Sequence, residues 1–212
     1  REGVLIERIA RSITLLLQEN HVIKDEDAAC CRYGLELFLS TCGEIAAILV
    51  LSVFTRNFLQ TVCFFLAFVP LRIFAGGYHA DTPLRCFGIL VAAFAALTLM
   101  LCFLPAVWYT PVITGAVLFT AVMVLAFAPV HHANKGYGES ERRQYRRTSI
   151  LICAVQSAAV IAALLLIHEA SQWLLAFSMG QLAVSLSMGA ANIKAFIKGK
   201  ELNKDEKVSE QC

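Results

Sequence analysis

The stretch FGILVAAFAALTLMLCFL, residues 87–104, contains no charged residue and no proline. An α-helix needs about 20 apolar residues to cross the hydrocarbon core of a bilayer. The chain holds six apolar runs of this kind: 33–54, 58–74, 84–105, 112–129, 149–167 and 173–193. These runs are too long and too continuous for the alternating pattern of a membrane β-barrel. Because a helix satisfies its own backbone hydrogen bonds, the sequence predicts an all-α integral membrane bundle of about six transmembrane helices.

The composition of the whole chain supports a single membrane domain over residues 1–212. Of the 212 residues, 58% are hydrophobic and only 16% are charged, whereas the average charged share is about 25%. The net charge of +2 is too small to indicate nucleic-acid binding. None of the eight cysteines has the spacing of a disulfide framework or a zinc site. We therefore expect no metal and no cofactor.

The region before the first apolar run, residues 1–32, has a different pattern. In residues 4–17, VLIERIARSITLLL, apolar side chains recur at helical spacing with charged ones between them. This pattern is typical of an amphipathic helix that lies at the membrane interface. The bundle then occupies 33–197, and a polar tail follows over 198–212.

The placement of Lys and Arg predicts the orientation, because basic links stay on the cytoplasmic side. The link around 105–111 carries no charge, and the link after the fifth run offers only His168 and Glu169. Only Arg56, in the link after the first run, runs against the pattern. Basic residues gather in the link after the fourth run and in the tail: Lys135, Arg142, Arg143, Arg146, Arg147, Lys198, Lys200, Lys204 and Lys207. Both termini and the segment 75–83 are therefore predicted to be cytoplasmic.

The segment 72–86, RIFAGGYHADTPLRC, carries the residues suited to chemistry. Gly76-Gly77 ends one predicted helix, either as a plain cap or to let a substrate chain approach closely. Thr82-Pro83 suits the start of the next helix. Cys86 then falls in the first turn, where the helix dipole stabilises a thiolate. His79 lies seven residues earlier, and a Cys–His pair within hydrogen-bond reach is the minimum apparatus of a thiol nucleophile; alternatively His79 is an interfacial histidine without a partner.

Four charged residues surround this segment. Asp81 either orients His79, as the third member of a triad does, or caps the helix. Arg72 can extend its side chain to the interface, and Glu36 is a candidate partner for it. Glu44 lies about 12 Å deeper than Glu36 at 1.5 Å per residue. A carboxylate at that depth costs about 3 kcal/mol and indicates function by default, although protonation or a bond to a neighbouring Ser or Thr would also accommodate it.

The order of residues resembles the motif of the accessory gene regulator B (AgrB) family: Arg72, three residues, Gly76-Gly77, Tyr78, His79, six residues and Cys86. The amphipathic start, the six spans, the basic link after the fourth span and the chain length fit the same family. The resemblance implies a quorum-sensing endopeptidase of the bacterial cell membrane. Its partner would be the precursor of an autoinducing peptide, from which it removes the C-terminal segment while promoting thiolactone or lactone cyclisation.

The resemblance also assigns roles. It implies that Cys86 is the nucleophile and His79 its general base, that Arg72 and Gly77 support the site, and that the protein acts as a homodimer. The acyl-enzyme would be a thioester that a thiol inside the peptide can attack. Family precursors carry an acidic C-terminal part, so Arg142 and Arg143 are candidate contacts for it, although the stretch 142–147 also fits a plain positive-inside anchor.

Three other functions remain open from the residues alone. A metal-dependent membrane hydrolase could use His79, Asp81, His131 and His132, although no HExxH pattern is present. A small transporter or channel finds its best support in Glu44, but no pair of broken helices in matching halves is visible. A scaffold that only docks a peptide would leave His79 and Cys86 without a chemical role.

Overall fold

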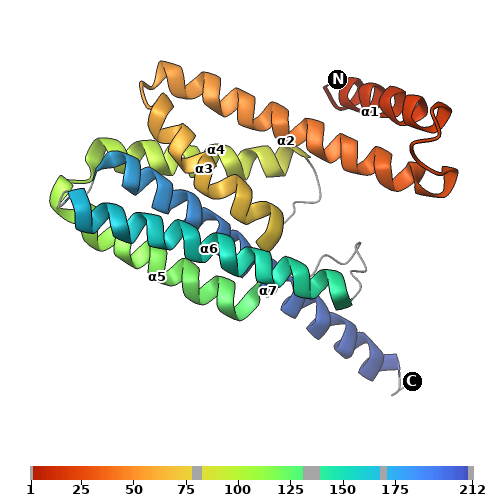
Figure 1. The fold of residues 1–212 in the computed structure, drawn as a ribbon. Coiled ribbons are helices and arrows are strands. Elements are labelled where there is room, and N and C mark those ends of the chain that lie inside the picture. Colours follow the sequence, from red (N-terminus) through yellow and green to blue (C-terminus); the bar gives the residue numbers. More distant parts are fainter. Residues whose placement is uncertain (1, 78–82, 131–138, 168–170, 210–212) are drawn as a thin grey trace.

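The computed structural model describes residues 2–77, 83–130, 139–167 and 171–209, with side chains except at 2–5, 37, 83–86, 167 and 198–209. Every regular element in these ranges is helical (Figure 1). The elements are α1 (Glu2–Glu19), η1 (Asp25–Asp27), α2 (Ala28–Phe54), α3 (Phe58–Ala75), α4 (Pro83–Phe103), η2 (Ala106–Trp108), α5 (Tyr109–Phe127), α6 (Glu139–Ile167) and α7 (Gln172–Ser209). The predicted all-α fold class is therefore confirmed.

Five helical segments in the described part of the chain are long and apolar enough to cross a membrane: Asp25–Phe54, Phe58–Ala75, Ala106–Phe127, Glu139–Leu166 and Gln172–Ile197. The sixth apolar helix, Phe87–Phe103 of α4, is shorter. These six correspond one to one to the six apolar runs of the sequence. Two helices extend ten residues or more beyond their runs. α6 begins in the polar residues before 149, and α7 continues to Ser209, so most of the predicted polar tail is helical.

α7 is the central helix of the bundle, and its main neighbours are α3 and α5. Gly180 on α7 permits the close approach to α3: an added Cβ would overlap Phe64 O and lie 3.1 Å from Ala67 Cβ. Small residues at such crossings let membrane helices pack closely, and this packing holds them together where the lipid is as apolar as the side chains. The glycine therefore belongs to the packing of α3 on α7.

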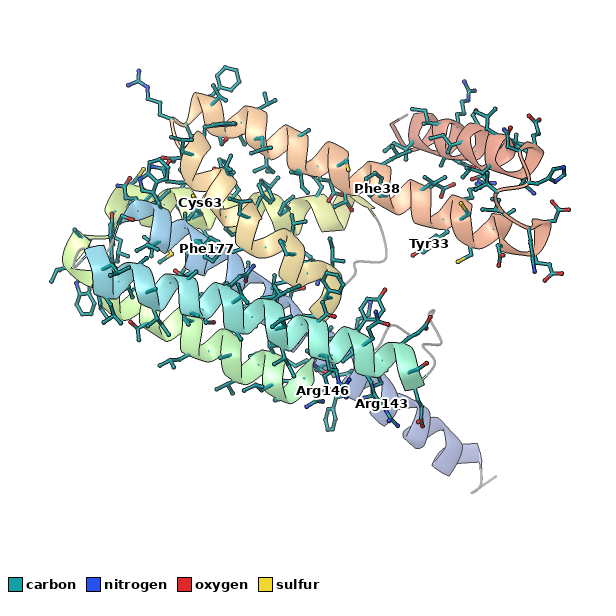
Figure 2. The ribbon with its side chains drawn as sticks, in the orientation of Figure 1. Tyr33, Phe38, Cys63, Arg143, Arg146 and Phe177 are labelled. Atoms are coloured by element: carbon teal, nitrogen blue, oxygen red, sulfur yellow. The ribbon has the colours of Figure 1, made fainter. Side chains whose placement is uncertain are left out.

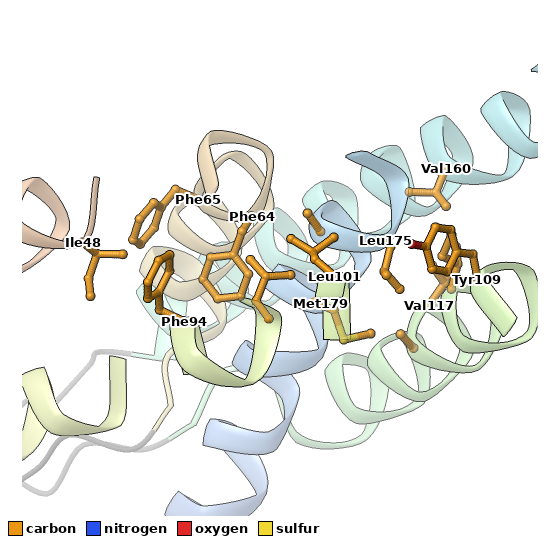
Figure 3. Close-up of a cluster of buried hydrophobic side chains, with 14 of the residues drawn as sticks. Ile48, Phe64, Phe65, Phe94, Leu101, Tyr109, Val117, Val160, Leu175 and Met179 are labelled. Carbon is orange, nitrogen blue, oxygen red and sulfur yellow. The ribbon is translucent and has the colours of Figure 1, made fainter. Parts of the chain in front are cut away.

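Two apolar clusters fill the bundle. The larger joins α2, α3, α4, α5, α6 and α7, and includes Ile48, Phe64, Phe94, Tyr109, Val160, Leu175 and Met179 (Figure 3). The smaller lies where α3 and α5 end, against α6 and α7: Leu71, Ala75, Val124, Ala128, Val130, Cys153, Val184 and Met188. The C-terminal end of α3 packs into this smaller cluster through Leu71 and Ala75.

A buried amide pair links three helices. Gln156 Nε2 on α6 donates to Ala67 O on α3 at 3.1 Å, and Gln181 Nε2 on α7 donates to Gln156 Oε1 at 3.2 Å. Thr120 and Ser185 add a hydroxyl contact of 3.3 Å between α5 and α7. Interhelical hydrogen bonds of this kind stabilise helix association in membranes by about 1 kcal/mol each.

The amphipathic segment 4–17 forms α1, which packs against α2 at one side of the molecule (Figure 1). Arg32 of α2 joins the two helices: its Nη2 lies 2.7 Å from Glu7 Oε1, and its Nε lies 2.9 Å from Glu36 Oε1. Ala10 and Thr14 on α1 are buried. The predicted helix is therefore present, and its interfacial position in a bilayer stays a prediction.

Candidate active site at the end of α3

Two glycines end α3 and turn the chain. Gly76 has φ 77° and Gly77 has φ 148°, values that L-residues with a side chain rarely adopt. The N–H of Gly76 donates to Arg72 O at 3.1 Å and closes the last turn. The prediction that Gly76-Gly77 stops this helix is therefore confirmed.

Arg72 ties this turn to α7, the central helix of the bundle. Its Nη1 donates to Gly76 O at 3.2 Å and to Ser187 Oγ, on α7, at 2.7 Å. The last carbonyls of a helix lack intrahelical partners and carry partial negative charge, so a guanidinium there is favourable. One nitrogen atom thus joins the end of α3 to α7.

Gly77 is required for this contact by space as well as by φ. A Cβ built on Gly77 would overlap Arg72 Nη1 and lie 2.7 Å from Ser187 Oγ. The guanidinium therefore occupies the volume that any larger residue would need. The structure brings together three of the residues predicted to support the site, Arg72, Gly76 and Gly77, and adds Ser187 to them.

The end of α3 also makes contacts with other segments of the bundle. Leu71 and Ala75 are fully buried in the smaller apolar cluster. Val130 N, just after α5, donates to Ala75 O at 3.0 Å. Phe74 packs against Tyr145 of α6 with ring centroids 6.0 Å apart. Three other helical segments therefore fix the point from which the chain continues to the predicted catalytic histidine.

The two predicted catalytic residues are placed only in part. His79 and Asp81 lie in 78–82, outside the described residues. α4 begins at Pro83, as predicted, and its first turn contains the backbone of Cys86, whose side chain is not described. The Cys86–His79 pair and the role of Asp81 stay predictions.

Glu36 pairs with Arg32 and not with Arg72. Glu36 accepts a hydrogen bond from Arg32 at 2.9 Å, four residues away on the same helix, while Arg72 is bonded to Ser187 and Gly76. The predicted Glu36–Arg72 pair is therefore wrong. The reason is local, because a partner one turn away on α2 satisfies this carboxylate. Glu44 is half-buried on α2.

The basic stretch 142–147 divides into residues with different contacts (Figure 2). Arg142 and Arg143 are exposed at the start of α6, and Arg143 Nη2 lies 3.3 Å from Glu139 Oε2. Arg146 Nη2 donates to Leu125 O, in the last turn of α5, at 3.1 Å. Arg146 therefore caps a neighbouring helix, a role that the sequence pattern of four similar arginines did not reveal.

Ser187 was also missed by reasoning from sequence. A serine inside a long apolar run looks like any other small residue of a membrane helix, and nothing near it in the chain indicates a partner 115 residues away. For the metal alternative, the described part of the chain contains no cluster of His, Cys, Asp and Glu suited to an ion. The residues proposed as its ligands, His79, Asp81, His131 and His132, lie outside that part.

Fold and site together define a class: an all-helical, multi-span membrane protein with a Gly-Gly turn, latched by an arginine, just before a helix whose first turn holds a cysteine. The family model of accessory gene regulator B, AgrB, matches residues 10–188. The chain therefore belongs to the AgrB family, which takes part in the processing of autoinducer precursors. Comparison with curated proteins and with solved structures found no match.

Proposed function

We propose that this protein is a membrane-embedded cysteine endopeptidase that removes the C-terminal segment of an autoinducing-peptide precursor. Family membership supports the substrate class. The observation that carries the chemistry is the start of α4 at Pro83, which puts Cys86 in its first turn. A helix N-terminus stabilises a thiolate there. The Gly76-Gly77 turn, held by Arg72, leads directly into the segment that contains His79.

In the proposed reaction, His79 accepts the thiol proton of Cys86, and the sulfur attacks the scissile carbonyl carbon. In an α-helix the first N–H groups lack intrahelical partners; in α4 these include Leu84 and Arg85, which would stabilise the oxyanion. The C–N bond breaks, and His79 returns its proton to the leaving amine of the C-terminal fragment. The retained part of the precursor is now a thioester on Cys86.

A thiol or hydroxyl within the retained peptide then attacks this thioester. Its oxygen or sulfur bonds to the acyl carbon, the bond to Cys86 Sγ breaks, and Cys86 recovers a proton as a thiol. The product is a lactone or thiolactone ring. Exclusion of water from the site favours this internal attack over hydrolysis.

The proposal includes an orientation and partners. Exposed Arg142 and Arg143 at the start of α6, and the lysine-rich end of α7, would lie on the cytoplasmic side of a bacterial cell membrane with both termini. The precursor would approach from that side, its acidic C-terminal part attracted by Arg142 and Arg143. A second copy of the chain completes a homodimer.

Mass spectrometry of a co-expressed precursor tests the mechanism. We expect the unmodified protein to release the C-terminal fragment, and Cys86→Ala and His79→Ala to release none. Cys102→Ala is the matched control, since Cys102 is exposed near the opposite end of the same helix, and it should cleave normally. Cleavage by Cys86→Ala would refute the thiol mechanism. If a chelator then abolished this remaining cleavage, the result would favour the metal-dependent hydrolase. Precursor binding without cleavage by any variant would favour the docking scaffold.

A further inference from the structure

We propose that Ser187 is a positioning residue of this site, holding the Gly76-Gly77 turn in place through Arg72. The inference rests on the proposed function, because the turn matters for catalysis only if the segment after it supplies His79. Ser187 belongs to α7, 115 residues away from Arg72 in the chain. It is therefore a tertiary contact of the catalytic segment and not part of its motif.

The geometry of the contact is that of a strong hydrogen bond. Arg72 Nη1 lies 2.7 Å from Ser187 Oγ, within the short range expected when a charged donor meets a hydroxyl. The same nitrogen also lies 3.2 Å from Gly76 O. Since one guanidinium nitrogen binds both, α7 and the turn are held at a fixed separation.

The neighbouring glycine completes the arrangement. The space beside Gly77 is filled by the guanidinium, and Ser187 Oγ lies 2.7 Å from the position of an added Cβ. With the arginine in this position, residue 77 has no room for a side chain. Glycine, arginine and serine form one packed unit.

Ser187 lies in a well-packed part of α7. The adjacent Met188 and the nearby Val184 are fully buried in the cluster that also contains Leu71 and Ala75 of α3. A misplacement of about 1 Å at a catalytic group can lower a rate by about 100-fold. A contact anchored in the bundle core is suited to preventing such a displacement.

Ser178, on the same helix, bonds within α7. Its Oγ donates to Leu175 O at 2.9 Å. Bonding to the helix's own carbonyls is the ordinary behaviour of serine in a membrane helix. Ser187 accepts a hydrogen bond from an arginine of another helix, and Ser178 provides a matched control on the same helix.

Hydrogen–deuterium exchange of the purified full-length protein tests the positioning itself. In Ser187→Ala and in Arg72→Gln, peptides that cover residues 72–86 should exchange faster than in the unmodified protein. The double variant should exchange no faster than Arg72→Gln alone, because the contact is already lost. Ser178→Ala should leave these peptides unchanged. Unchanged exchange in Ser187→Ala, or faster exchange throughout the bundle, would overturn the inference.

Precursor cleavage by the same variants tests the link to catalysis. Ser187→Ala should lower kcat about tenfold and change KM by no more than about twofold. The reason is that precursor binding is unaffected while the catalytic segment is misplaced. Ser178→Ala should cleave at the normal rate. Normal kcat in Ser187→Ala, with cleavage still dependent on Cys86, would overturn the inference and leave the proposed function standing. Cleavage that persists in Cys86→Ala would refute the proposed function, while exchange would still decide whether Ser187 holds the turn.

Discussion

At the scale of single residues, the guanidinium of Arg72 fills the volume that a side chain at position 77 would need. The motif spacing of these two residues therefore has a steric cause. An arginine one turn before the end of a helix can fold over that end only if the residue just beyond it has no side chain. The positive φ of Gly77 adds a second, independent requirement for glycine.

Gly77→Ala should disturb the site for both reasons. The added Cβ would displace Arg72 from Ser187, and the backbone conformation would be strained by about 1–3 kcal/mol. We expect precursor cleavage to slow by more than tenfold and thermal unfolding to begin at a lower temperature. Gly88→Ala is the control, because a Cβ at this helical glycine of α4 meets nothing within 4 Å. Equal cleavage rates for the two variants would contradict the steric account.

How much of this residue-level detail can be predicted from sequence depends on the range of each contact. The Gly76-Gly77 stop and the Pro83 start follow from local backbone preferences, and both were predicted. The Arg32–Glu36 pair is also local, at one helical turn, yet Arg72 was the only candidate partner considered for Glu36. The bonds of Arg72 to Ser187 and of Arg146 to Leu125 O depend on how helices pack, which no local pattern specifies.

At the scale of helices, apolar runs located the membrane-crossing segments but not the full elements. α6 and α7 extend into polar sequence because residues there, such as those of 139–148, retain good helical propensity once the apolar part has formed the helix. Hydropathy identifies the residues that can lie in lipid, but it does not show whether a helix continues into water. The extension of α6 places Tyr145 against α3 and Arg146 against α5.

The buried amide pair between α6 and α7 makes a prediction at this scale. Gln156→Leu should lower the stability of the purified protein by about 1–2 kcal/mol, because it removes an interhelical bond and leaves the Gln181 amide N–H without its acceptor. The double variant Gln156→Leu/Gln181→Leu should be less destabilised than the sum of the two single variants, because neither amide is then left unpaired. Thermal unfolding in one detergent measures all three, and Gln144→Leu, an exposed glutamine of α6, is the control. Strict additivity of the single changes would contradict a direct bond.

At the scale of the whole molecule, the start of α6 lies against the end of α3 through the Phe74–Tyr145 contact. The basic stretch 142–147, which the sequence offered both as a topological anchor and as a contact for the precursor, thereby starts close to the end of α3. Arg143 and Glu139 form a surface pair whose side chains are 74% and 92% exposed, and such pairs add little stability. Replacing Arg142 and Arg143 is therefore expected to change the stability of the fold little.

Charge reversal at Arg142 and Arg143 should raise KM for the precursor several-fold with little change in kcat. The reason is that exposed charges attract an acidic segment during binding and take no part in the bond-breaking step. The effect should shrink at high ionic strength, since salt screens exposed charges over about 10 Å at 0.1 M. Steady-state cleavage of precursor by the protein in lipid vesicles, at low and high salt, measures both.

The arginines nearby separate this electrostatic role from a structural one. Arg146→Gln should leave KM nearly unchanged but lower the melting temperature, because Leu125 O loses its donor and a helix end is left unsatisfied. Arg56→Glu, at the exposed link between α2 and α3, should alter neither quantity by much if that link lies on the opposite side of the membrane. A rise in KM for Arg56→Glu equal to that for the Arg142 and Arg143 reversals would refute a local binding surface, since only the total charge of the protein would then matter. A salt-independent KM would refute the electrostatic attraction itself and leave the stretch 142–147 as an anchor alone.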